Sequence, residues 1–173
     1  RDPLRRLTLT CNQSCEKLTD VQSRQIFQLI DALSEGIGVE KDQRVRTALL
    51  LQRAVAYAEA QNYSDALADL DDYLAVEPGS VIGRWERAVC QAMQNSYDAS
   101  KGQNVSLKAA QAEGDFAEAL KLAPKNAYLY FDRGNLMAEG KHYDRAIDDY
   151  TRAIQIDPRL AEAYYNRGVV RCQ

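Results

Sequence analysis

The sequence predicts an all-α fold, a solenoid in which antiparallel helix pairs stack one after another. The first observation is an internal repeat: the sixteen-residue frame from Tyr63 to Pro78 returns from Tyr143 to Pro158. The second is the period, because Pro124 and Pro158 lie 34 residues apart. The third is the spacing of apolar positions within each repeat, which recur every three to four residues as they do along one face of a helix.

One repeat carries an insertion. Pro78 and Pro124 are 46 residues apart, which is twelve more than the period, and a recurring arginine register places the extra residues between Arg87 and Pro124. The polar run 95–104 is the obvious candidate, and we expect a loop or a helix-end extension at a turn, carried at little cost to stability. The predicted repeats are 47–80, 81–126 with the insertion near 95–106, 127–160, and a partial repeat over 161–173.

Each repeat is predicted to form two helices. In the repeat over 47–80, Gln61 and Asn62 break the apolar pattern between the helices, and Pro78 ends the second because proline cannot continue a helix. Small residues stand where the paired helices must approach closely, so a larger side chain there would overpack the contact. These positions are Ala54, Ala88, Gly134 and Gly168 in the first helices and Ala66, Ala112 and Ala146 in the second helices.

A 34-residue helix–turn–helix unit with these small, aromatic and terminal-proline positions resembles the tetratricopeptide repeat. The likeness covers roughly Thr47 to Gln173, as three repeats and the first helix of a fourth, and it implies a right-handed solenoid. The chain departs from the common pattern in its insertion and in an arginine that replaces a usually apolar residue. That variant, as in Tyr164-Tyr-Asn-Arg-Gly168, is similar to the repeats of many bacterial members.

The first 46 residues lie outside the period. Thr19 and Gln22 form a capping box, and an apolar stripe from Val21 to Leu33 predicts one helix over about Thr19–Glu35 that stops at Gly36. We expect this helix to cap the first repeat. Residues 1–17 are predicted as coil or a short helix, although 7–10 alternates as a strand would.

Composition and charge exclude several classes of function. The chain has 22 Lys and Arg against 25 Asp and Glu, a net charge of -3, which disfavours nucleic acid and membrane surfaces as partners. No apolar run is long enough to span a bilayer, and we expect a soluble chain as it stands. Because it begins with Arg1 and ends inside a predicted helix, we interpret it as a piece of a longer protein or a processed chain, so its targeting signals and compartment stay open.

No pattern in the sequence supports catalysis, a cofactor or a metal site. His142, the only histidine, is predicted at an exposed turn without catalytic partners. Cys11 and Cys15 have no second close Cys or His pair to complete a tetrahedral site, so we interpret them as free or loosely paired thiols. Gly36-Ile-Gly38 lacks the further glycine of a nucleotide-binding loop and is interpreted as a helix stop. We therefore predict that the protein is not an enzyme.

Arginines and aspartates recur at fixed places in the repeats. A solvated face is one interpretation, and an arginine row that binds a ligand is another. We favour structural ion pairs, in which each guanidinium crosses a helix–helix contact to meet a carboxylate, because arginine suits such partly buried bidentate pairing. The residues concerned are Arg53, Arg87, Arg133 and Arg167 in the first helices and Asp69, Asp115 and Asp149 in the second helices.

The resemblance implies a concave groove, lined by the first helices, that binds peptides. Family members that hold the C-terminal carboxylate of chaperones use Lys, Asn and Arg there, and Leu51 and Val55 stand at the first two of those positions, so such partners are disfavoured. A partner segment with apolar or aromatic side chains fits better. The residues expected to face the groove are Leu51, Val55, Trp85, Val89, Tyr128, Phe131, Asn135, Tyr165 and Val169.

The sequence thus predicts a non-catalytic scaffold that binds a protein or peptide partner. Two alternatives stay open. One is a structural or self-associating module whose groove is filled by its own chain, for example by residues 1–18, or by a neighbouring chain. In this alternative the C-terminal end, where no second helix covers the fourth repeat, is the expected contact. The other alternative is an accessory domain of a larger protein.

Overall fold

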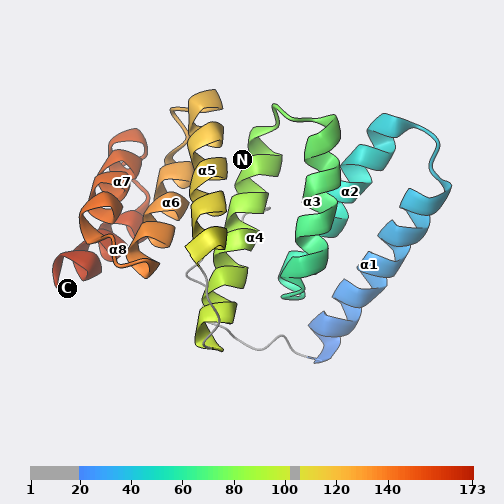
Figure 1. Cartoon of the computed structure of the whole chain (residues 1–173), viewed down its shortest axis with the longest axis horizontal. Coiled ribbons are helices and arrows are strands. Elements are labelled where there is room, and N and C mark those ends of the chain that lie inside the picture. The colour runs from blue at the N-terminus through green and yellow to red at the C-terminus, as the bar shows by residue number, and fades with distance from the viewer. Residues whose placement is uncertain (1–19, 102–105) are drawn as a thin grey trace.

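The computed structural model describes residues 20–101 and 106–173, and it builds them into eight helices without a strand. The helices run back and forth in chain order, from α1 at one end of the molecule to α7 and α8 at the other (Figure 1). The predicted all-α solenoid is therefore confirmed. None of the described helices is long and apolar enough to cross a membrane.

The helices form three pairs with one further helix at each end. α1 (Asp20–Val39) packs against α2 through Ile30 and Leu33, which contact Ala56. The pairs are α2 (Gln43–Glu59) with α3 (Tyr63–Val76), α4 (Val81–Ser100) with α5 (Ser106–Leu122), and α6 (Ala127–Glu139) with α7 (Tyr143–Ile156), and the last helix is α8 (Ala161–Arg171).

Polar residues begin the helices where the apolar pattern breaks. The Asn62 side chain accepts a hydrogen bond from the backbone N–H of Asp65, and the Ser80 hydroxyl accepts one from Gly83. Such caps satisfy N–H groups that have no partner within the helix. Gln61 and Lys141 occupy left-handed turns between paired helices, with φ of 59° and 61°.

The predicted stop of α1 at Gly36 is wrong, because the helix continues to Val39. Ile37 is buried, and the burial of its apolar side chain stabilises the longer helix. A Cβ atom on Gly36 would lie 3.3 Å from Leu49 Cδ1, so this glycine lets α1 and α2 approach closely instead of ending a helix.

The insertion lengthens helices. In the register set by Arg87 and Arg133, Met93 corresponds to Glu139, the last residue of α6, yet α4 continues to Ser100. The Ser96 hydroxyl donates to Glu139 Oε2 at 2.6 Å, so the extended end of α4 is tied to α6. Of the two expected forms, a loop or a helix-end extension, the structure shows the helix-end extension, with a hydrogen bond to α6.

The small residues of the helix contacts are almost all enclosed. Ala54, Ala66, Ala88, Ala112 and Ala146 are each at most 1% exposed. Two glycines of one register differ, however. A Cβ atom on Gly134 would lie 2.8 Å from Tyr150 Cε1, whereas one on Gly168 would meet nothing within 4 Å, so the expected overpacking at Gly168 is wrong.

Several sequence-based expectations lie outside the described residues. They concern the coil or short helix over 1–17, the thiols of Cys11 and Cys15, the Thr19 cap, and the occupation of the groove by residues 1–18.

We predict that Gly134→Ala destabilises the protein by about 1–3 kcal/mol, because the added methyl group collides with the buried Tyr150 ring. Gly168→Ala is the matched control and should leave the free energy of unfolding unchanged or raise it by up to about 1 kcal/mol, since alanine favours helix. Chemical denaturation of both variants measures the difference. Equal stabilities would contradict the close approach of α6 and α7.

Candidate functional site on the first helices

An arginine joins the two helices of each complete pair. Arg53 donates from Nε and Nη2 to the two carboxylate oxygens of Asp69, at 2.8 and 2.7 Å. Arg133 binds Asp149 in the same way, at 2.8 and 2.6 Å. The aspartate side chains are buried, and the side chains of Arg53 and Arg133 are 20% and 24% exposed. These bidentate bonds raise the pKa of both arginines, so the guanidinium groups stay charged at any physiological pH.

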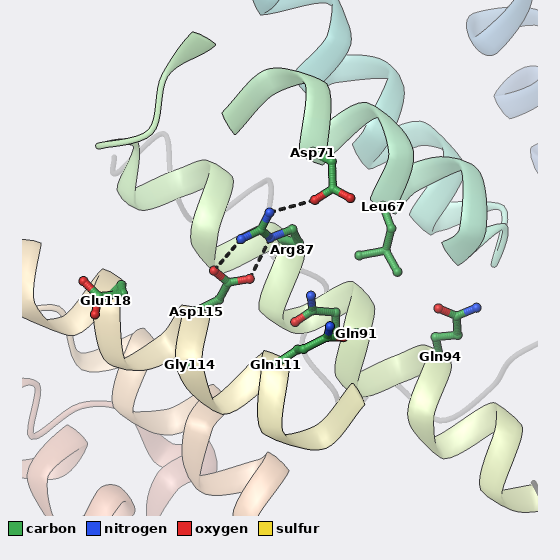
Figure 2. Close-up of a pocket in the computed structure, with 9 residues that line it drawn as sticks. All are labelled: Leu67, Asp71, Arg87, Gln91, Gln94, Gln111, Gly114, Asp115 and Glu118. Carbon is green, nitrogen blue, oxygen red and sulfur yellow. Dashed lines mark hydrogen bonds and ion pairs between the residues drawn. The ribbon is translucent and has the colours of Figure 1, made fainter. Parts of the chain in front are cut away.

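Arg87 holds two carboxylates at once (Figure 2). Its Nε and Nη2 donate to Asp115 of α5, at 2.7 and 2.8 Å, and its Nη1 donates to Asp71 of α3, at 2.7 Å. These residues lie beside a hollow of about 460 Å³ between α3, α4 and α5, which Gln91 and Gln94 also line. Because the guanidinium is committed to acids of its own chain, it connects helices and is poorly placed to bind a ligand.

Arg167 does not follow this scheme. Its Nη1 donates to Thr151 Oγ1 at 3.1 Å, and no ion pair to it is found within the described residues. The expected ion pair at Arg167 is therefore corrected to a hydrogen bond. In the three complete pairs the aspartate comes from the second helix, whereas Thr151 lies on α7, the helix before α8.

The predicted groove residues separate into a buried middle and more open ends. Trp85, Val89, Phe131 and Asn135 are only 1–6% exposed, contrary to the expectation that they line an open groove. Tyr165 and Val169 of α8 are 70% and 45% exposed. Leu51, Val55 and Tyr128 are partly buried.

Trp85 is buried because its indole joins α4 to α6. Its Nε1 donates to Asp132 Oδ2 at 2.8 Å, and its ring stacks on Tyr128 with 6.5 Å between centroids. Phe131 packs against Tyr150, with 5.9 Å between the ring centroids. These rings therefore hold the solenoid together and do not offer open area to a partner.

Asn135 also acts inside the molecule. Its Oδ1 accepts from the Tyr150 hydroxyl at 2.8 Å and from Asn166 Nδ2 at 2.9 Å, which links α6 to α7 and α8. Asp132 and Asn166 were not singled out from the sequence. A signal was present, because each directly precedes a recurring arginine, as do Gln52 and Glu86.

Glu86 is a buried acid. It is 2% exposed, and in the described ranges 20–101 and 106–173 neither carboxylate oxygen has a hydrogen-bond partner. Burial raises its pKa to about 8, and the charges of Asp132 and Glu59 act in the same direction. Burial likewise raises the pKa of Asp132 to about 7, against the opposing bond from Trp85. We call Glu59 of α2, Glu86 of α4 and Asp132 of α6 the acidic row.

The other reactive side chains show no arrangement for catalysis. Burial raises the pKa of the Cys90 thiol, and the charge of Glu86 adds to this effect, so the reactive thiolate is disfavoured. His142 is exposed at the start of α7. Within the part of the chain that the structure describes, no group of His, Cys, Asp and Glu side chains is placed to hold a metal ion.

An apolar hollow remains open at the start of the row of first helices. It measures about 590 Å³ and lies between α2 and α3. Leu51 and Val55 line it together with Ala48, Tyr73 and Val76. Apolar area is thus available at α2 and at α8, on either side of the buried middle.

Comparison with known families decides the identity of the repeats. A TPR repeat model matches residues 134–173, and a tetratricopeptide repeat model matches residues 51–100. The chain belongs to the tetratricopeptide repeat family. Tetratricopeptide repeats are generally non-catalytic modules of protein–protein interaction. A search of curated protein sequences gives no match.

Solved structures share the fold of this tetratricopeptide repeat protein. A crystal structure of MamA is 18% identical, with a TM-score of 0.68 over 88% of this chain and 84% of that one. YrrB, described as having an unusual peptide-binding site, is 15% identical, with a TM-score of 0.70 over 86% and 69%. The first repeat domain of Spaghetti (RPAP3), bound to an HSP90 peptide, is 20% identical, with a TM-score of 0.62 over 77% and 95%.

We predict that Arg133→Ala lowers the free energy of unfolding by about 1–3 kcal/mol, because it leaves the buried Asp149 carboxylate unpaired. The loss should stay below the about 3–5 kcal/mol of a fully buried pair, since the arginine keeps some exposure to water. Arg167→Ala, which breaks one hydrogen bond to Thr151, is the control and should cost less than about 1 kcal/mol. Denaturant titration compares the two, and a larger loss for Arg167→Ala would contradict this assignment.

We predict that Glu86 makes the fold less stable as pH rises. Its pKa is about 8 in the fold against 4.5 ordinarily, so between these values the unfolded chain has lost a proton that the folded chain keeps. The free energy of unfolding therefore falls as pH rises from about 4.5 to about 8.

Glu86→Gln should remove much of this loss, by an amount on the order of a few kcal/mol at pH 8, and change little at pH 4. Thermal melts across this pH range test it, with the exposed Asp148→Asn of α7 as control. A lower melting temperature of Glu86→Gln at pH 8 would show that the charge of Glu86 stabilises the fold.

Proposed function

We propose that this tetratricopeptide repeat protein is a non-catalytic scaffold that binds a segment of a partner protein along its first helices. The observation that carries the proposal is the apolar area left open at the groove register. It comprises the hollow beside Leu51 and Val55 on α2, and Tyr165 and Val169 on α8. Binding draws on apolar surface that is still in contact with water, so these two ends are better suited to apolar contact with a partner than the buried Trp85.

The chemistry of this face favours an apolar partner segment over a C-terminal carboxylate. Leu51 and Val55 replace the Lys and Asn of chaperone-binding members, and the acids Glu86 and Asp132 lie in the middle of the row. Neither acid supplies the positive charge that a carboxylate partner needs. With a net charge of -3, the chain is also a poor match for nucleic acid or an anionic membrane.

Self-association is a second candidate, favoured by the surface of α8. Tyr164, Tyr165 and Val169 are 45%, 70% and 45% exposed on one short helix. Exposed aromatic and apolar side chains at one end of a solenoid suit contact with a second copy.

We predict that Tyr165→Ser with Val169→Ser weakens partner binding at least about tenfold, because it removes apolar contact area without disturbing the core. Peptides selected from a displayed random library on the parent protein serve as probes, and calorimetric titration gives the affinities. The matched control is Tyr97→Ser with Val39→Ser, which changes side chains that are 51% and 78% exposed elsewhere. Equal affinity for the parent and for the α8 variant would refute a role for α8.

Light scattering over a range of concentrations separates the two candidates. A molar mass of 19.4 kDa that stays constant supports the scaffold that binds a different protein. A mass that doubles with concentration for the parent and the control, and stays constant for the α8 variant, supports self-association.

A further inference from the structure

Three buried oxygen atoms of the acidic row have no hydrogen-bond donor among the residues that the structure describes. They are Oε1 and Oε2 of Glu86 and Oδ1 of Asp132. The two residues are only 2% and 5% exposed, so bulk water does not satisfy these atoms. Buried acceptors without a partner destabilise a fold and are rare in native proteins, so they call for an explanation.

The arginines that follow these two acids in the sequence bind other carboxylates. Arg87 directly follows Glu86, but its guanidinium binds Asp71 and Asp115. Arg133 directly follows Asp132 and binds Asp149 of α7 in the same way. Consecutive residues on a helix point in different directions, so the acids and the arginines lie on different sides of each first helix.

The acidic row lies on three first helices, of which α4 contacts both α2 and α6. The indole of Trp85, the residue before Glu86, donates to Asp132 Oδ2, and the charges of Asp132 and Glu59 add to the raised pKa of Glu86. Glu59 is exposed and lines a hollow of about 320 Å³ with Gln22, Gln25, Ile26 and Leu29. The row therefore has a buried part and one end that is open to solvent.

We infer that the acidic row binds a cationic side chain, lysine or arginine, of the partner segment. This inference rests on the proposed function and specifies the chemistry of the partner. An ammonium or guanidinium group brings several N–H donors and a positive charge to acceptors that lack both. The carboxyl groups release their protons to solvent as the cation binds, and the buried pair becomes a charge-assisted contact.

Selection from a displayed random peptide library tests this inference. The library is panned on the parent, on Glu86→Gln with Asp132→Asn, and on a control that removes two exposed charges, Asp72→Asn with Asp148→Asn. We expect lysine and arginine to be enriched severalfold on the parent and on the control, and not on the row variant. Sequencing of the recovered peptides gives the frequencies.

A direct affinity measurement completes the test. Fluorescence of Trp85, the only tryptophan, reports on the row because its indole N–H donates to Asp132. In a selected peptide, replacing the basic residue by glutamine should weaken binding to the parent about tenfold or more, and should change binding to the row variant little. The row substitutions keep the side-chain shapes and remove the titratable groups, and thermal melts confirm that the variant is folded.

Each result has one meaning. Peptides recovered without an excess of basic residues, or basic peptides that bind the row variant as tightly as the parent, overturn this inference and leave the scaffold proposal standing. A parent protein that yields no specific peptide overturns the scaffold proposal and, with it, this inference.

Discussion

The bidentate arginine–aspartate pair is the interaction on which each helix pair depends. Asp69, Asp115 and Asp149 are buried carboxylates in second helices, and each is satisfied by an arginine that crosses from the first helix. A buried charge without its partner is far more costly than a missing surface contact, so the pair specifies which faces of the two helices meet. Arg87 also links a third helix, because its guanidinium binds Asp71 of α3 as well as Asp115 of α5.

The chain therefore contains two kinds of buried acid. The aspartates of the second helices have strong donors at short distances, and they explain the architecture. Within the described part of the chain, neither oxygen of Glu86 has a donor, and Asp132 has one only at Oδ2, from the Trp85 indole. The unpaired oxygens of Glu86 and Asp132 are the feature that separates the candidate site from the ion-paired scaffold that holds it.

The fold was largely predictable because its landmarks are local. Pro78, Pro124 and Pro158 mark the ends of second helices, and small residues mark the close contacts, so the period alone predicts helix pairs. Gly36 was misjudged because packing of α1 against α2 outweighs the weak helix propensity of glycine.

The candidate site was harder to predict because it depends on distant contacts. Trp85 is buried and donates a hydrogen bond to Asp132, which is 47 positions away in the sequence. No local pattern shows whether such a contact exists. The polar residues that precede the arginines were visible in the sequence, but their burial was not, because it requires the relative placement of α2, α4 and α6.

The linear arrangement of helices has a consequence for how the protein opens. α4 and α6 each pack against four other helices, whereas α1 packs mainly against α2, and α8 against α7 and α6. In a solenoid with nearest-neighbour contacts, the ends separate by local unfolding while the middle stays closed. The exposed Tyr165 and Val169 lie on α8, which has few such contacts here, so a partner that binds α8 also suppresses its local unfolding, and the affinity includes the free energy of holding that helix in place.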